Sequence, residues 1–141
     1  GGMLDKFIGD GAMASFGIAG EKVGDPPASR AIACAKAILA ATNEWNVARG
    51  GQPIRISIGV HYGPVVVGDV GSSRRMELAV IGDAVNVASR LEEMTRTLGV
   101  RAAISEETVK AAGDQAGLSE RGPQPVLGRE EPVIVWAVTD R

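Results

Sequence analysis

Two polar residues near the start of the chain lie where a short turn would hold them rigidly. Asp10 stands between Gly9 and Gly11, and an Asp-Gly pair between two short apolar runs is typical of a β-hairpin. A carboxylate at such a tip keeps both oxygens free, which suits a hard cation such as Mg²⁺. Lys6 lies four residues earlier in the first run. Taken alone, each residue is equally consistent with an ordinary solvated hairpin side chain.

A second polar pair lies in the middle of the chain, where a helix is expected. Asn86 and Arg90 are four residues apart, so on a helix they share one face, opposite the apolar stripe. An amide and a guanidinium side by side form a donor pair for a phosphate or ribose oxygen. The alternative is a solvated face on which Arg90 pairs with Glu93.

The remaining reactive residue types show no catalytic or metal-binding pattern. His61 follows an apolar strand and has no Cys, His or paired carboxylate at ligand spacing, so we expect a structural role at a strand end. Cys34 lies in an alanine-rich helix pattern, where we expect a buried, inert thiol. The sequence contains no P-loop, no G-x-G-x-x-G, no G-x-S-x-G and no zinc pattern.

Hydrophobic periodicity and turn residues predict the elements that position these side chains. The helix that carries Asn86 and Arg90 is expected at about 84–98. A longer helix is expected at about 27–48, with one side formed by Ala31, Ala35, Ile38, Thr42 and Trp45. Strands are expected at 3–8, 12–16, 54–60, 65–70, 77–81 (or a short connection there), 100–104 and 132–139, with a short helix at 105–112. Hairpins and helices without a dividing linker predict a single α+β unit.

The bulk composition excludes several classes of partner. The chain has 141 residues, a net charge of −2 and 4% aromatic residues. It therefore lacks the basic surface and the stacking side chains of a nucleic-acid-binding sheet. No apolar run approaches the length of a membrane span, so we expect no membrane contact in this segment, although the full-length protein could be membrane-attached. A single cysteine fits a reducing compartment, and we expect a cytoplasmic location.

Several stretches follow one another in an order and spacing that together are specific. They are GGMLDKFIGDGAMASFG at 1–17, IGVHYG at 58–63 with Val67-Gly68, VIGDAVNVASRL at 80–91, and the segment 128–136. These stretches resemble, in order, the first hairpin, the central hairpin, the signature helix and the closing strand of class III adenylate cyclase catalytic domains, within the adenylate/guanylate cyclase family. The resemblance covers nearly the whole chain.

The resemblance implies a ferredoxin-like catalytic domain with a central antiparallel sheet and flanking helices. It further implies a head-to-tail dimer, a homodimer here, that binds ATP at its interface and uses two Mg²⁺ or Mn²⁺ ions to make 3′,5′-cyclic AMP and pyrophosphate. Asp10 corresponds to a metal ligand, Asn86 to the residue that positions the ribose, and Arg90 to the arginine that stabilises charge on the α-phosphate. Lys6 corresponds to the lysine that reads the adenine edge, where guanylate cyclases usually have glutamate, so ATP is favoured over GTP. Asp10 would come from one protomer, and the other three residues from the second.

The sequence departs from the family pattern at three places. The family domain begins with a strand, which carries the other metal aspartate, and two helices that have no counterpart here. We therefore expect 1–141 to be an N-terminally truncated, partial domain that is inactive alone. Ala79 stands where an adenine-selecting Asp or Thr is expected, and Leu127 replaces a phosphate-binding lysine for which Arg129 could substitute. Ala79 and Leu127 support an alternative, a catalytically degenerate domain that acts as a dimerisation or regulatory module.

Overall fold

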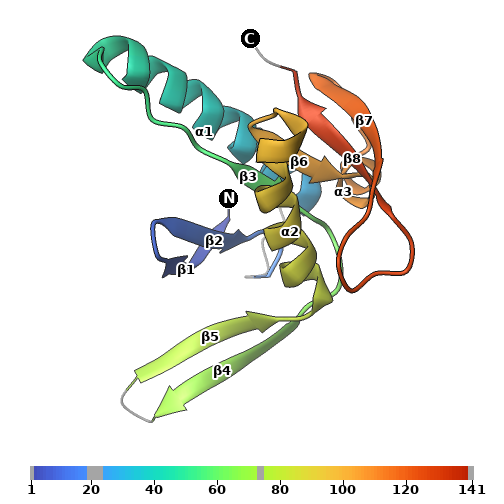
Figure 1. Ribbon diagram of the computed structural model, residues 1–141. Helices are drawn as coiled ribbons and strands as arrows, with labels where there is room; N and C mark the ends of the chain where they lie inside the picture. The colour runs from blue at the N-terminus through green and yellow to red at the C-terminus, as the bar shows by residue number, and fades with distance from the viewer. Residues whose placement is uncertain (1, 19–23, 73–74, 140–141) are drawn as a thin grey trace.

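Figure 1 shows the computed structural model, in which one four-stranded sheet, two separate hairpins and three helices form the described part of the chain. The structure describes residues 2–18, 24–72 and 75–139. The elements are, in chain order, β1 (Met3–Ile8), β2 (Gly11–Ser15), α1 (Pro27–Arg49), β3 (Ile58–Val60), β4 (Val66–Ser72), β5 (Arg75–Ile81), α2 (Asp83–Leu98), β6 (Ala102–Ser105), α3 (Glu106–Ala112), β7 (Leu118–Gln124) and β8 (Val133–Val138).

The four-stranded sheet has the strand order β3-β6-β8-β7. β3 pairs with β6 in parallel, beginning at Ile58 opposite Ala102, while β8 is antiparallel to both β6 and β7. The predicted α+β class is confirmed. The sheet is mixed, with one parallel pair beside the expected antiparallel ones, because β3 and β6 are joined by a crossover that contains α2.

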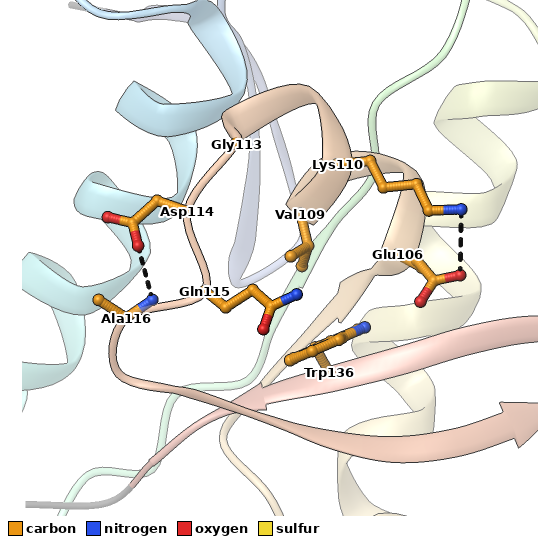
Figure 2. A pocket seen from close by; sticks show the side chains of 8 residues that line it. All are labelled: Glu106, Val109, Lys110, Gly113, Asp114, Gln115, Ala116 and Trp136. Atoms are coloured by element: carbon orange, nitrogen blue, oxygen red, sulfur yellow. Dashed lines mark hydrogen bonds and ion pairs between the residues drawn. The ribbon is translucent and has the colours of Figure 1, made fainter.

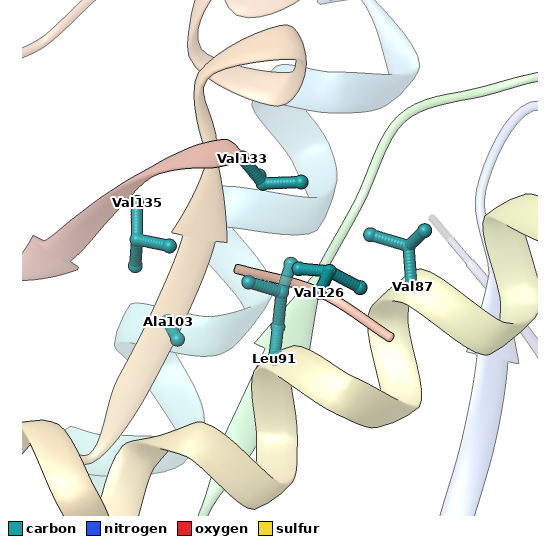
Figure 3. Close-up of a cluster of buried hydrophobic side chains, with 6 residues drawn as sticks. All are labelled: Val87, Leu91, Ala103, Val126, Val133 and Val135. Carbon is teal, nitrogen blue, oxygen red and sulfur yellow. The ribbon is translucent and has the colours of Figure 1, made fainter. Parts of the chain in front are cut away.

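The core lies on both faces of this sheet. Neighbouring residues of β6 and β8 point to opposite sides, so Ala103 and Val135 face α2 while Ile104 and Trp136 face α1 and α3. Figure 3 shows the cluster on the α2 side, which consists of Val87, Leu91, Ala103, Val126, Val133 and Val135. The predicted apolar stripe of α2 is confirmed, since its residues enter this cluster and the helix ends at Gly99 as expected.

Helix α1 forms where it is predicted, and its packed side is shifted from the predicted one. The buried residues are Ala28, Ile32, Ala35, Leu39 and Thr42, so the prediction is confirmed for Ala35 and Thr42. It is wrong for Ile38 and Trp45, which are 39% and 51% exposed. The prediction is wrong by part of a turn because alanines lie all around this helix, so periodicity defines its packed face only weakly.

The strand predicted at 54–60 is reduced to Ile58–Val60. The backbone of Ile54 is hydrogen-bonded to a side chain and not to a neighbouring strand. Asn46 Nδ2 donates to the Ile54 carbonyl at 2.9 Å, and the Ile54 nitrogen donates to Asn46 Oδ1 at 2.8 Å. Because this amide satisfies both backbone groups, alternation of Ile54 and Ile56 does not extend the strand.

Two pairings differ from the sequence prediction. The strand 65–70 does not return against 58–60. Instead β4 pairs with β5 along its whole length, from Val66 opposite Ile81 to Ser72 opposite Arg75, and Figure 1 shows this ribbon extending away from the sheet. The segment 118–124, for which the sequence predicts neither a helix nor a strand, is strand β7. Pro123 is tolerated there because β7 lies at the edge of the sheet, and the register shifts next to Gly122.

A glycine on β3 allows α2 to approach the sheet closely. A Cβ at Gly59 would overlap the carbonyl oxygen of Ala88 and the backbone nitrogen of Glu92, both in α2. Backbone atoms cannot move aside as a flexible side chain can, so the helix would have to shift.

We therefore expect Gly59→Ala to lower the free energy of unfolding by about 1–3 kcal/mol. Urea denaturation followed by circular dichroism measures this change. Gly68→Ala is the matched control, because a Cβ at Gly68 on β4 meets no atom within 4 Å. Equal stability of the two variants would show that α2 does not depend on the close contact.

Candidate active site

The first hairpin presents Lys6 and Asp10 to solvent. Lys6 lies on β1 opposite Met13 of β2, and Asp10 lies in the turn between the strands, where Gly9 adopts a positive φ of 60°. Both side chains are exposed. A carboxylate on a short turn has both oxygens available for a ligand, as the sequence suggests.

Helix α2 presents Asn86 and Arg90 on the side away from the core. Both are exposed, whereas Val87 and Leu91, each one position further along, are buried. Arg90 Nη1 lies 3.2 Å from Glu93 Oε1, which is the ion pair expected of a solvated helix face. An exposed pair of this kind contributes little stability, so the guanidinium can exchange Glu93 for an anionic ligand at small cost.

The loop between β7 and β8 carries Leu127 and Arg129. Leu127 is 80% exposed and offers no polar group. Arg129 is partly buried, with Nη2 lying 3.6 Å from Glu107 Oε2 of α3 and its backbone nitrogen donating to the Val126 carbonyl at 3.0 Å. Ala79 lies on β5 opposite Gly68 of β4.

The structure does not bring all of these residues together. Among the described residues, no hydrogen bond or ion pair joins Lys6 or Asp10 of the hairpin to Asn86 or Arg90 of α2. The described part of the chain also contains no group of three or more His, Cys, Asp or Glu side chains that could hold a metal ion. Asp10 fits a divalent cation as one hard oxygen ligand, and a complete metal site needs further ligands from elsewhere.

One known domain family matches the segment of the chain that contains these residues. The model for the adenylate and guanylate cyclase catalytic domain matches residues 6–139. The chain belongs to this cyclase family. The match contains Lys6, Asp10, Asn86, Arg90 and Arg129 in one continuous segment.

The relatives of this cyclase domain include proteins named adenylate cyclase and proteins named guanylyl cyclase. An adenylate cyclase of Anabaena cylindrica is 36% identical over 98% of this chain, which spans 28% of that protein. Among solved structures, the adenylyl cyclase CyaB from P. aeruginosa is 31% identical with a TM-score of 0.73, and covers 99% of this chain and 72% of its own. The guanylyl cyclase Cya2 is 35% identical with a TM-score of 0.76, and covers 97% of this chain and 69% of its own. This chain thus spans less than a third of the Anabaena protein, and no helix among its described residues is long and apolar enough to cross a membrane.

His61 of the cyclase domain is hydrogen-bonded to a residue that lies far from it in the sequence. The side chain is partly buried, and its Nδ1 lies 2.8 Å from Ser105 Oγ, at the end of β6. Burial lowers the pKa of the imidazole below its ordinary value of 6.5; Glu107 and Asp83 oppose this shift and Arg129 adds to it. The sequence offers no local signal for this cluster, because His61 and Ser105 are 44 residues apart.

A cavity elsewhere on the domain contains none of the predicted site residues. It has a volume of about 530 Å³ and lies between α3, the segment that follows α3, and Trp136 of β8 (Figure 2). The buried indole nitrogen of Trp136 has no hydrogen-bond partner among the residues that the structure describes.

The lowered pKa of His61 makes stability depend on pH in a defined direction. Because the folded protein binds a proton on His61 less readily than the unfolded chain, this contribution is fully present above about pH 6.5 and is lost as the pH falls below that value. We expect His61→Asn to remove this part of the pH dependence. Melting temperatures of both proteins at pH 7.5, 6.5 and 5.5 provide the measurement. Parallel losses in the two proteins would contradict the prediction.

Proposed function

We propose that the protein converts ATP to 3′,5′-cyclic AMP and pyrophosphate. The observation that carries the proposal is that two elements of a cyclase-family domain expose polar side chains. The hairpin exposes Lys6 and Asp10, and α2 exposes Asn86 and Arg90. The family resemblance implies a nucleotide or metal role for each of the four, and none is buried for packing. Relatives named adenylate cyclase support the same activity.

In this reaction the ribose 3′-hydroxyl attacks the α-phosphorus, the bond to the bridging oxygen breaks, and pyrophosphate leaves. Two Mg²⁺ or Mn²⁺ ions, when bound, would lower the pKa of the attacking hydroxyl and neutralise phosphate charge. Asp10 would serve as one of their ligands. Asn86 would hold the ribose through its amide, and Arg90 would donate to the α-phosphate oxygens as negative charge develops there. No side-chain nucleophile is required.

We propose that the site is completed in a dimer with a second copy of the domain, so that Asp10 of one protomer meets Lys6, Asn86 and Arg90 of the other. Among the described residues of one chain, no hydrogen bond or ion pair joins Asp10 to Asn86 or Arg90, which supports this arrangement. So do large apolar side chains of β1 that lie exposed beside the polar residues: Leu4, Phe7 and Ile8 are 56%, 74% and 58% exposed. Exposed apolar surface next to functional groups is typical of a surface that is covered on association.

We propose ATP as the substrate because Lys6 stands where guanylate cyclases usually have glutamate. A lysine ammonium donates to acceptors and cannot accept, so it complements the N1 acceptor of adenine better than the N–H of guanine. Ala79 supplies no hydrogen bond at the companion position, so Lys6 carries most of this preference. Because a guanylyl cyclase is among the structural neighbours, the preference for ATP over GTP has to be tested directly.

A catalytically degenerate regulatory domain is the second candidate. The observation that favours it is Leu127, an exposed apolar residue at the position of a phosphate-binding lysine. Arg129 would replace that lysine while its guanidinium also pairs with Glu107.

Substitution of Arg90 tests the activity. In the full-length protein, Arg90→Ala is expected to lower turnover of ATP with Mg²⁺ or Mn²⁺ by at least ~10²-fold, because charge on the α-phosphate loses its donor. Cyclic AMP separated by chromatography is the readout. Arg96→Ala, at another exposed arginine of α2, is the control and should retain activity. Absence of cyclic nucleotide from both ATP and GTP with the unaltered full-length protein would favour the regulatory domain.

Substitution of Lys6 tests the choice of base. Lys6→Glu is expected to lower the ratio of kcat/KM for ATP to that for GTP by at least about tenfold, because the carboxylate accepts from guanine and repels the acceptor of adenine. Lys110→Glu, on α3, makes the same charge change outside the proposed site and should leave the ratio unaltered. An unchanged ratio in Lys6→Glu would remove Lys6 from base recognition.

A further inference from the structure

A closed ring of hydrogen bonds joins the end of β3 to the beginning of α3. His61 Nδ1 lies 2.8 Å from Ser105 Oγ, and Ser105 Oγ lies 2.8 Å from Thr108 Oγ1. Thr108 Oγ1 donates to the carbonyl of Val60 at 3.4 Å, next to His61 in the chain. Ser105 and Thr108 are fully buried and His61 is partly buried, so the two hydroxyl groups of the ring are shielded from water.

One assignment of the protons satisfies all of these contacts. In it, the Thr108 hydroxyl donates to the Val60 carbonyl and accepts from the hydroxyl of Ser105. Ser105 Oγ accepts from His61 Nδ1 and, as the N-cap of α3, from the Thr108 backbone nitrogen at 3.4 Å. This assignment has a proton on Nδ1 of His61.

The same helix start holds Arg129. Glu107 lies in the first turn of α3, two residues after Ser105, and its carboxylate pairs with the Arg129 guanidinium at 3.6 Å. The backbone of Arg129 is tied to Val126, which is buried in the core. The direction of α3 at its first turn thus decides where Glu107 holds the guanidinium.

We propose that His61 is a positioning residue for phosphate binding. Through Ser105 it orients the first turn of α3, and Glu107 on that turn places Arg129 to receive the phosphate chain of the nucleotide. The inference rests on the proposed function, because it takes Arg129 as the substitute for the lysine absent at 127. It assigns His61 no contact with the reacting atoms, so its removal affects substrate affinity rather than the chemical step.

A matched pair of substitutions at residue 61 separates this role from packing. Asn carries an amide nitrogen that can donate to Ser105 Oγ in place of Nδ1, whereas Leu fills similar space and donates nothing. We expect His61→Leu to raise KM for ATP and the Kd for magnesium pyrophosphate about fivefold, with kcat changed less than about twofold. His61→Asn should remain within about twofold of the unaltered protein in each quantity.

Two further variants keep the test decisive. Ser29→Ala removes a hydrogen bond from Ser29 Oγ to the Ala112 carbonyl at the far end of α3, and it should not alter pyrophosphate affinity. Glu107→Gln removes the ion pair without touching His61, and it should raise the Kd for pyrophosphate as His61→Leu does. Tighter binding in Glu107→Gln would mean that Glu107 competes with phosphate, and it would overturn the proposal.

Calorimetric binding of magnesium pyrophosphate does not require turnover, so the inference can fail separately from the proposed function. A full-length protein that makes no cyclic nucleotide but shows the expected loss in His61→Leu would overturn the cyclase activity and retain the positioning role. Unchanged pyrophosphate affinity in His61→Leu and Glu107→Gln, with activity intact, would overturn the positioning role alone.

Discussion

The close contact between α2 and β3 is the constraint on which the rest of the structure depends. Gly59 lets the helix backbone lie directly against the strand, and this approach places Val87 and Leu91 in the core. Because side chains of a helix repeat every 3.6 residues, burial of that side directs Asn86 and Arg90 to the surface. The donor pair proposed for the nucleotide is therefore positioned by apolar packing on the other side of the same helix.

The proposed catalytic residues lie at the margin of the core, on elements that are only partly supported by it. The β1–β2 hairpin forms a two-stranded sheet of its own, and such a hairpin has little stability alone. It exposes apolar residues such as Phe7 next to Asp10. Association with a second domain would stabilise the hairpin and complete the site at once, which links assembly of the proposed dimer to activity.

Residues near the proposed phosphate site depend on contacts that are distant in sequence. His61, Ser105 and Arg129 come from three separate segments and meet where β3, α3 and the β7–β8 loop converge. Periodicity and turn patterns describe neighbours within a few residues, so they assign His61 only to a strand end. Its hydrogen bond to Ser105 arises from the parallel pairing of β3 with β6, which no local pattern indicates.

The sequence by itself determined the hairpin around Asp10, the stripe and ends of α2, and membership of the cyclase family, because each depends on short-range spacing or on motifs in order. Only the tertiary structure decided that β4 pairs with β5, that α1 buries Ile32 and Leu39 instead of Ile38, and that 118–124 forms an edge strand. Strand pairing and helix orientation depend on contacts between residues that lie far apart in the chain. They depend on which surfaces can be buried together, and alanine, glycine and proline patterns leave that choice open.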